Sequence, residues 1–342
     1  MLYVSGVSKH LFYLLSELSK DEAYNIILVC PGGDFIDEFK KLKITVIEIE
    51  EISHQKRSYL NFLKSVLSIY SIVKKNKIEI IHSHTHYSAN IAWWVSKITK
   101  CITIQTIHGV IPSGGRFPHF IADYFIIVNK NSIKHLMSNR KKKERIFFVN
   151  LGIPIPEKHL KDNSEIKILF ASRLVPEKGG DIYLDAIALA KDKLIVKNSF
   201  AMAGEGVSEN ELRKQITDLK IQVSFLGKVE NIYDYLKDSH IFIFTSRYQL
   251  EGFPLTIVEA ALNGNLIITS DFASLKEIFQ EDIDCLVFHN NDSIQLSEKI
   301  ILAVNNYKDY SEMIVQGIEK AKNNFSISKM LYELKQVYQN VT

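Results

Sequence analysis

The sequence contains few cysteines and lacks the long apolar segments that cross membranes. Three cysteines stand far apart in 342 residues, and none belongs to a Cys-x-x-Cys pair. Neither a zinc site of that type nor a disulfide framework is therefore predicted. No apolar run reaches the roughly 18 residues that a transmembrane helix needs, and no signal-peptide pattern precedes the first predicted elements. We expect a cytoplasmic protein.

The chain also lacks a strong net charge. Its formal net charge is +3, with 24% charged and 46% hydrophobic residues, so nothing argues for a nucleic-acid partner. Basic residues do cluster at Lys74–Lys77 and at Arg140–Arg145. Such clusters more often form a solvated surface, but they can also attract anionic lipid headgroups. These basic clusters are compatible with peripheral contact with the inner face of an anionic membrane.

Two further signatures are missing. No Gly-x-Gly-x-x-Gly pattern follows a first strand, which disfavours a dehydrogenase. No Asp-x-Asp pair ends a strand, where it could hold a divalent cation. We therefore predict neither a bound metal nor a resident cofactor.

Short β-branched runs alternate with longer amphipathic segments along the chain. Apolar residues at helical spacing predict helices within residues 10–18 and 59–75. Strands are predicted at residues 23–30, 44–50, 78–84, 102–109, 124–129, 166–172, 199–204, 223–227, 241–246 and 265–270. Because strands that alternate with helices form parallel sheets covered on both faces, we predict an α/β protein of two doubly wound domains. The boundary falls near residues 152–165, where prolines and charges interrupt the periodicity.

The segment 251–264 (EGFPLTIVEAALNG) carries the strongest chemical signal. Pro254 suits the first turn of a helix and Gly264 its C-terminal end, which places Glu251 before the helix and Glu259 in its second turn. The axial rise from residue 254 to residue 259 is only about 7.5 Å. The two carboxylates can therefore serve different parts of one extended ligand. A solvated role for Glu259 is the alternative, but its apolar neighbours disfavour it.

Phosphate-binding groups are predicted at two places. Backbone N–H groups at a helix start have no partner within the helix and suit a diphosphate. Here they belong to Phe253, Leu255 and Thr256. The segment 172–181 (SRLVPEKGGD) adds Arg173 and Lys178 after a predicted strand. Two cations there would stabilise the charge of a leaving diphosphate, although by themselves they would equally fit two solvated loop residues.

Together these motifs resemble family 4 of the retaining glycosyltransferases, the glycosyl transferases group 1, which have the GT-B fold. The resemblance covers nearly the whole chain, and its most specific element is the pair Glu251 and Glu259, with seven residues between them. The other motifs are SGVSKH (5–10), IHSHTH (81–86), IHG (107–109), NLGIPIP (150–156), SRLVPEKGG (172–180), AGEG (203–206), FLGKVEN (225–231) and ASLKEI (273–278).

The resemblance implies an arrangement of domains. Two Rossmann-like domains would face each other across a cleft, with an acceptor-binding domain at 1–155 and a donor-binding domain at 156–325. The final helix, 326–342, would pack back toward the first domain.

The resemblance also implies roles for particular residues. His108 would lie near the transferred sugar and the diphosphate, Glu251 would face that sugar, and Arg173 and Lys178 would contact the diphosphate. These four are the implied catalytic residues. The implied donor-binding residues are Gly6, Gly204, Glu205, Phe253, Leu255 and Glu259, the last of them on the ribose hydroxyls.

The implied activity is transfer of a hexose-type sugar from a nucleotide-diphosphate donor, most commonly a UDP-sugar. The acceptor would be a glycan or a lipid-linked glycan, as in the synthesis of bacterial capsule or exopolysaccharide. Transfer would retain the anomeric configuration and need no metal, since cations and helix-start N–H groups would stabilise the leaving diphosphate. Two alternatives remain at this point: a nucleotide-sugar epimerase of the same fold, and a non-catalytic partner subunit.

The alternating histidines His82, His84 and His86 could suggest a metal site. They come where a predicted strand ends and strict alternation stops, and no carboxylate in the sequence completes a ligand set. We predict instead that they line the acceptor-binding region.

The first strand is predicted to be truncated. The turn-like SGVS (5–8) follows only four residues, and Ser5 stands where family members have the first of two glycines. A missing central strand would expose a sheet edge and weaken the N-terminal domain. This feature is what motivates the non-catalytic alternative.

Overall fold

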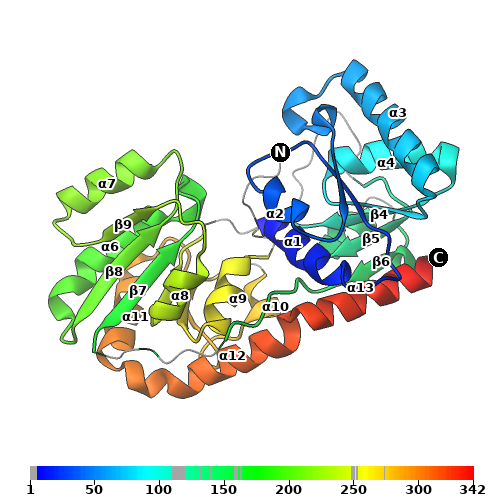
Figure 1. Cartoon of the computed structure of the whole chain (residues 1–342). Coiled ribbons are helices and arrows are strands. Elements are labelled where there is room, and N and C mark those ends of the chain that lie inside the picture. The colour runs from blue at the N-terminus through cyan, green and yellow to red at the C-terminus, as the bar shows by residue number, and fades with distance from the viewer. Residues whose placement is uncertain are drawn as a thin grey trace. The chain divides into compact units, whose positions relative to one another are not determined.

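The computed structural model divides the chain into two compact units, Met1–Pro154 with Phe325–Thr342, and Ile155–Asn324 (Figure 1). It describes residues 6–109, 120–130, 132–138, 141–157, 161, 164–247, 251, 253–272 and 274–342. The chain thus passes through the second unit and returns to the first for its last helix. The predicted roles of the two domains, acceptor binding and donor binding, stay predictions.

The second unit is built on one parallel sheet in the order β12-β11-β10-β7-β8-β9. Its strands are β7 (Ile166–Ala171), β8 (Asn198–Ala203), β9 (Ser224–Gly227), β10 (Ile241–Phe244), β11 (Leu266–Ser270) and β12 (Leu286–Phe288). Its helices are α6 (Gly180–Ala190), α7 (Glu209–Asp218), α8 (Tyr233–Asp238), α9 (Leu255–Leu262), α10 (Leu275–Ile278), α11 (Ser293–Asn305) and α12 (Ser311–Phe325). Every residue of β10 is buried, as expected of a central strand covered on both faces.

The first unit contains two parallel sheets among its described residues, β1-β2 and β3-β4-β5-β6. The strands are β1 (Ile27–Cys30), β2 (Thr45–Glu48), β3 (Ile80–Ser83), β4 (Ile102–Ile107), β5 (Tyr124–Ile127) and β6 (Ile146–Phe148). The helices are α1 (Gly6–Leu18), α2 (Ile36–Lys40), α3 (Tyr59–Asn76), α4 (His86–Thr99), α5 (Ser132–Ser138) and α13 (Ile327–Val341).

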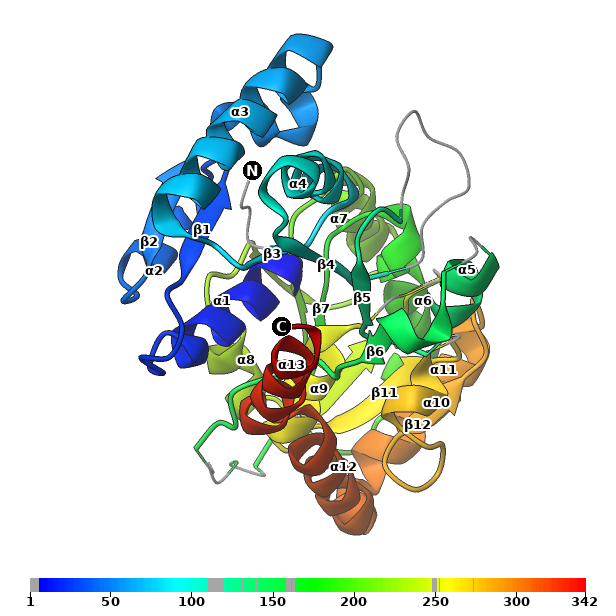
Figure 2. The same ribbon diagram turned by 90° about the vertical axis from the view of Figure 1, so that its right-hand side faces the viewer.

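Helix α13 belongs to the core of the first unit, and Figure 2 shows it beside α1. Leu334 and Val337 lie in one apolar cluster with Leu11 and Leu14 of α1. Each such side chain contributes roughly 1.5–3 kcal/mol when fully buried. The start of α13 lies close to Gly152, where an added Cβ would be 2.8 Å from the Cα of Ile327. Only glycine fits beside the start of α13 without displacement.

The predicted fold class is confirmed, with most strands shorter and both predicted helices longer than the patterns indicated. All ten predicted strands are present, but β6 and β12 were not predicted because three-residue strands carry too little alternation to detect. One local prediction was wrong: residues 6–8 form the first turn of α1 rather than a turn before it. The predicted truncation of a first strand concerns residues 1–5, which lie outside the described residues.

Candidate functional site

The strand order of the second unit defines where a ligand can bind. The chain winds outward from β7 through β8 to β9, then returns to β10 on the other side of β7. The segments that follow β7 and β10 therefore leave the sheet in opposite directions. A crevice opens between two such segments at the carboxyl ends of the strands, and doubly wound proteins bind ligands there.

Two predicted site residues meet at this switch point. Lys178 ends the short 3-10 helix η4 (Pro176–Lys178) after β7, and Glu251 lies in the connection from β10 to α9. The ammonium of Lys178 donates to both carboxylate oxygens of Glu251, at 2.6 and 2.8 Å. Their side chains are only 13% and 14% exposed. A charge-assisted pair this sheltered from water is much less screened than a surface ion pair.

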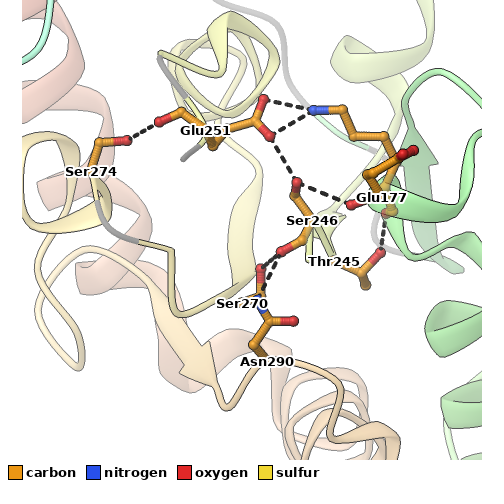
Figure 3. Close-up of polar contacts among 8 residues, drawn as sticks. Glu177, Thr245, Ser246, Glu251, Ser270, Ser274 and Asn290 are labelled. Carbon is orange, nitrogen blue, oxygen red and sulfur yellow. Dashed lines mark hydrogen bonds and ion pairs between the residues drawn. The ribbon is translucent and has the colours of Figure 1, made fainter. Parts of the chain in front are cut away.

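A set of hydroxyl groups holds the pair in place (Figure 3). The Ser246 hydroxyl donates to Glu251 Oε2 at 2.8 Å, and the Ser274 hydroxyl donates to the Glu251 backbone carbonyl at 2.8 Å. On the other side, the Thr245 hydroxyl contacts the carbonyl oxygens of Lys178 and Gly179, each at 2.8 Å. These three hydroxyl residues were not predicted as site residues. Thr245 and Ser246 directly follow the buried strand β10, which was the only local signal, whereas Ser274 comes just before α10.

Gly179 is also fixed by this contact. Its φ is +66°, and an added Cβ would lie 2.3 Å from the Thr245 carbonyl oxygen. A side chain here would push η4 away from the end of β10. The glycine therefore allows the Lys178 segment to pack directly against the segment that carries Glu251.

The other predicted cation and the second glutamate lie in different environments. Arg173 is exposed, and no ion pair is found for it within the part of the chain that the structure describes. Glu259 lies in the second turn of α9, as predicted, and only 1% of its surface is exposed. Because burying a carboxylate costs free energy unless it is hydrogen-bonded, its burial implies that polar groups contact it.

The start of α9 differs slightly from the prediction. Pro254 is the N-cap residue, with extended backbone, rather than part of the first turn. Leu255 is the first helical residue and its side chain is buried in the core, while Phe253 is half-buried. Leu255 and Thr256 are the first two helical residues, and N–H groups at these positions have no partner within a helix. Gly264 follows the helix with φ of +71°, the left-handed conformation expected at that end.

The predicted nucleotide-base loop packs on the segment after β7. An added Cβ at Gly204 would lie 1.9 Å from the Ser172 carbonyl oxygen, so only glycine fits. The Leu174 backbone N–H donates to the Glu205 carbonyl at 2.9 Å. The Glu205 side chain is exposed, 3.3 Å from the ammonium of Lys228. The structure thus places this loop directly beside the residues that flank Arg173.

The first unit gathers histidines at the carboxyl ends of β3 and β4. His84 Nδ1 lies 3.0 Å from His108 Nε2, and the two rings stack. His82 contacts the hydroxyls of Tyr338 and Thr106, at 2.8 and 2.7 Å. Tyr338 comes from α13, 256 positions away in the sequence. These hydrogen bonds hold the imidazoles of two neighbouring strands in fixed orientations.

His10 of α1 completes the histidine cluster. Its ring lies 5.2 Å from that of His108, edge to face. Burial lowers the pKa of His84 to about 4, and the pKa values of His10, His82 and His108 are also well below the usual 6.5. Neighbouring imidazoles add to the last three shifts. The cluster is therefore uncharged at neutral pH.

This cluster differs from the predicted run of three alternating histidines. His86 is the first residue of α4 and contacts Gln105 at 2.8 Å, away from the other two. Ligand nitrogens of His10, His84 and His108 lie within 4.8 Å of one another. Neutral imidazoles at such distances have the chemistry of a transition-metal site. The pKa shifts of the four histidines come from burial and from one another, with no carboxylate among the causes.

The remaining predicted residue of the first unit is Gly6, the exposed first residue of α1. Among the described residues no helix is long and apolar enough to span a bilayer.

The fold and the switch-point residues define a doubly wound α/β protein with two Rossmann-like units. Solved structures with this fold include a glycosyltransferase from Rickettsia africae, with 19% identity and a TM-score of 0.84 over 99% of this chain and 96% of that one. HepE of Anabaena in complex with UDP and glucose gives 16% identity and a TM-score of 0.82, covering 99% of this chain and 97% of that one.

The family follows from sequence comparison. The model for Glycosyltransferase Family 4 matches residues 4–155, and the model for glycosyl transferases group 1 matches residues 153–320. The chain therefore belongs to the family-4-type glycosyltransferases, and its activity is glycosyl transfer. An α-1,4-N-acetyl-D-galactosaminyltransferase of Campylobacter jejuni, named for an undecaprenol-linked substrate, is 24% identical over 96% of this chain and 93% of its own length. An Escherichia coli UDP-Gal:α-D-GlcNAc-diphosphoundecaprenol α-1,3-galactosyltransferase is 24% identical over 94% and 90%.

Proposed function

We propose that the second unit binds the diphosphate of a nucleotide-sugar donor at the switch point between β7 and β10. The observation that carries this proposal is the sheltered pair of Lys178 and Glu251 at that point. A bound diphosphate would offer Lys178 a partner of higher negative charge. The lysine would then exchange its bonds to Glu251 for bonds to phosphate oxygens.

This exchange assigns complementary roles to the two residues. As the bond from the sugar to the diphosphate breaks, negative charge grows on the leaving group and positive charge on the sugar. Lys178 and Arg173, with the N–H groups at the start of α9, stabilise the negative charge on the leaving diphosphate. The carboxylate of Glu251, released from the lysine and still held by Ser246, stabilises the positive charge on the sugar. We propose on this basis a transferase that retains configuration and requires no metal at the diphosphate.

The remaining assignments rest on the family resemblance. Glu259 binds the ribose hydroxyls, and the loop containing Gly204 and Glu205 borders the nucleotide base. His108 contacts the transferred sugar. Because burial keeps its pKa well below 6.5, it does so as a neutral hydrogen-bonding group.

We further propose a UDP-sugar carrying a hexose as the donor, and a glycan attached to a membrane lipid as the acceptor. The relatives from C. jejuni and E. coli, and a capsular polysaccharide biosynthesis glycosyltransferase of Staphylococcus aureus, support this class of reaction. The enzyme would then work at the inner face of a bacterial membrane, contacting it peripherally, in the synthesis of a surface polysaccharide.

The test is donor binding by calorimetry, with UDP-, GDP-, ADP- and TDP-sugars, followed by product analysis. A true donor at 100 times its dissociation constant should raise the free energy of unfolding by about 2.7 kcal/mol. Hydrolysis or transfer with retained configuration, undiminished by EDTA, would support the proposal. Interconversion of two nucleotide sugars without transfer would identify an epimerase, and failure to bind any donor would leave the non-catalytic alternative.

A further inference from the structure

Helix α3 presents an apolar stripe on its outer face. Leu60, Leu63 and Leu67 recur at the three- and four-residue spacing that places side chains on one side of a helix. They are 63%, 60% and 66% exposed. On an amphipathic helix, the face that points away from the core normally carries polar residues. This helix therefore has apolar residues both toward its unit and away from it.

Helix α4 extends the exposed apolar surface. It packs against α3 through a shared cluster that includes Val73 of α3 and Val95 of α4, and Figure 1 shows the two helices side by side. After that shared face is buried, Trp94 and Ile98 of α4 remain more than half exposed. We call these five exposed apolar side chains, three on α3 and two on α4, the α3–α4 surface.

The charged residues of α3 and α4 themselves are all basic. Neither α3 nor α4 contains an aspartate or a glutamate, and Glu79 is the single acidic residue between residues 57 and 101. The same stretch contains basic residues at Arg57, Lys64, Lys74, Lys75, Lys77, Lys97 and Lys100. Lys64, Lys74 and Lys75 are exposed on α3, and Lys97 is exposed on α4.

This combination points to a particular kind of partner. Exposed leucines with a tryptophan, on two helices whose charged residues are all basic, match an interface between water and anionic lipid. Two acidic residues, Glu50 and Glu51, lie on the 3-10 helix η1 (Glu50–Ile52), which packs against α3. At a lipid interface the apolar side chains enter the acyl boundary and the lysines remain among the headgroups. Apolar residues that stand alone on a surface need no such explanation, but a continuous stripe does. A protein partner would not require that both helices carry only basic charges.

We propose that the α3–α4 surface docks the first unit on an anionic bilayer. The inference deepens the proposed function, since a lipid-linked acceptor is located in the same bilayer. It also locates the contact on α3 and α4, which the basic clusters of the sequence alone did not. Of those two clusters, Lys74–Lys77 adjoins this surface.

The first test is sedimentation of the full chain with vesicles of phosphatidylcholine, with or without roughly 30% phosphatidylglycerol. The phosphatidylglycerol gives the vesicles the negative surface charge of an anionic membrane. We expect binding to the anionic vesicles alone, weakened at 0.5 M salt, which shortens the Debye length to about 4 Å. The variant Leu60→Ser/Leu63→Ser/Leu67→Ser should bind at least about tenfold more weakly, because three apolar side chains no longer enter the lipid.

A matched control exists in the second unit. Ile195, Val207 and Ile294 are 84%, 84% and 64% exposed, so Ile195→Ser/Val207→Ser/Ile294→Ser removes as much exposed apolar surface elsewhere. It should bind vesicles like the wild type. The melting temperatures of both triple variants are compared with that of the wild type, since exposed positions should change it little.

A second variant pair tests the charges. Lys74→Glu/Lys75→Glu should weaken binding to anionic vesicles strongly, by about fivefold or more per reversed charge. The control Lys214→Glu/Lys308→Glu changes two exposed lysines of the second unit and should have little effect. If the α3 variants bind vesicles as well as the wild type does, or if binding ignores phosphatidylglycerol, the proposal is wrong.

Two further measurements distinguish membrane docking from a dimer interface and from the proposed donor binding. Light scattering tests whether a second copy covers the α3–α4 surface instead. A dimer that the leucine variant disrupts, with no vesicle binding, would overturn membrane docking. Calorimetry with UDP-sugars tests the proposed function independently. Vesicle binding without donor binding would contradict the function but not the docking surface, and the leucine variant should keep wild-type donor affinity.

Discussion

The two units place polar side chains at the same kind of position, the carboxyl ends of parallel strands, but with different chemistry. The first unit has neutral imidazoles that are buried or half-buried, with His84 and His108 in contact. The second has an ion pair, Lys178 with Glu251. A diphosphate carries charge and needs a cation, whereas sugar hydroxyls need neutral donors and acceptors. The difference therefore matches the two ligands that a glycosyltransferase must hold.

The difference also has a cost in stability that depends on pH. Four histidines, of which His10 is buried and the other three are half-buried, have pKa values lowered by loss of solvent and have no charged partner, so acid destabilises the first unit. The ion pair of the second unit carries no such stability cost, because each charged group already has a partner of opposite charge. The predictions below test this contrast, from the largest expected effect to the smallest.

Loss of the lysine should have the largest effect. We expect Lys178→Met to lower turnover by roughly 10²–10³-fold while donor affinity changes less, because its charge matters most as the diphosphate leaves. The measurement is kcat and KM for donor in the transfer assay. Arg173→Ala should change the same parameters in the same direction. A loss of donor affinity that fully accounts for the loss of rate would contradict a role in the transition state.

A matched control separates chemistry from stability. Lys320 forms a 2.6 Å ion pair with Asp284, whose side chain is only 3% exposed. Lys320→Met leaves a carboxylate buried without its cation, as Lys178→Met does, and should destabilise the fold by a similar mechanism. Its turnover at a temperature where it is folded should equal that of the wild type.

Acid should destabilise the first unit selectively. The pKa of His84 is about 4 in the folded chain and near 6.5 when unfolded. Between these values the unfolded chain holds the extra proton, so stability is complete above pH 6.5 and falls as the pH drops toward 4. At about 1.36 kcal/mol per pKa unit, this residue alone contributes about 3 kcal/mol. His10, His82 and His108 act in the same direction.

Hydrogen exchange, corrected for the intrinsic pH dependence of amide exchange, measures this loss in each unit separately. Protection of β3 and β4 should fall between pH 6.5 and 4 before that of β7 and β10. His84→Gln should reduce the slope, whereas His289→Gln, at an exposed histidine of the second unit, should not. Equal loss of protection in both units would refute the contrast.

The buried glutamate of α9 should control nucleotide affinity. We expect Glu259→Gln to weaken UDP binding by roughly 10–100-fold, since a charge-assisted hydrogen bond contributes about 1.5–3 kcal/mol. Glutamine keeps the volume of a side chain that is 1% exposed. Calorimetry with UDP measures the change, and the exposed Glu298→Gln on α11 is the control. Unchanged affinity in a folded variant would remove Glu259 from the ribose site.

The smallest effect is expected for the hydroxyl that holds Glu251. Ser246→Ala removes the 2.8 Å bond to Glu251 Oε2, and about 1.4 kcal/mol of positioning corresponds to roughly tenfold in turnover. Donor affinity should change little. Ser297→Ala removes a comparable 2.7 Å bond, from its hydroxyl to the Ile294 carbonyl in α11, and should leave turnover unchanged. If the two variants have equal turnover, Ser246 has only a structural role.

Local patterns in the sequence were sufficient for the elements and for the positions of several candidate residues on them. Alternating β-branched runs and amphipathic segments predicted two doubly wound domains, because the side-chain periods of strands and helices differ. The segment 251–264 predicted Glu259 in the second turn of α9 and Gly264 after its end, since helix starts and ends have strong residue preferences. These features depend on near neighbours in the chain, so the sequence determines them directly.

Contacts between distant segments were decided by the tertiary structure. Lys178 and Glu251 are 73 positions apart, and they meet because β10 pairs with β7 on the side opposite β8. Tyr338 contacts His82 only because the chain returns to the first unit for α13. The low pKa values of the histidines likewise depend on segments that are far apart in the chain. Periodicity reports on one element at a time, whereas strand order and burial depend on the whole chain. The sequence therefore pointed to candidate residues but not to the partners that they contact in the fold.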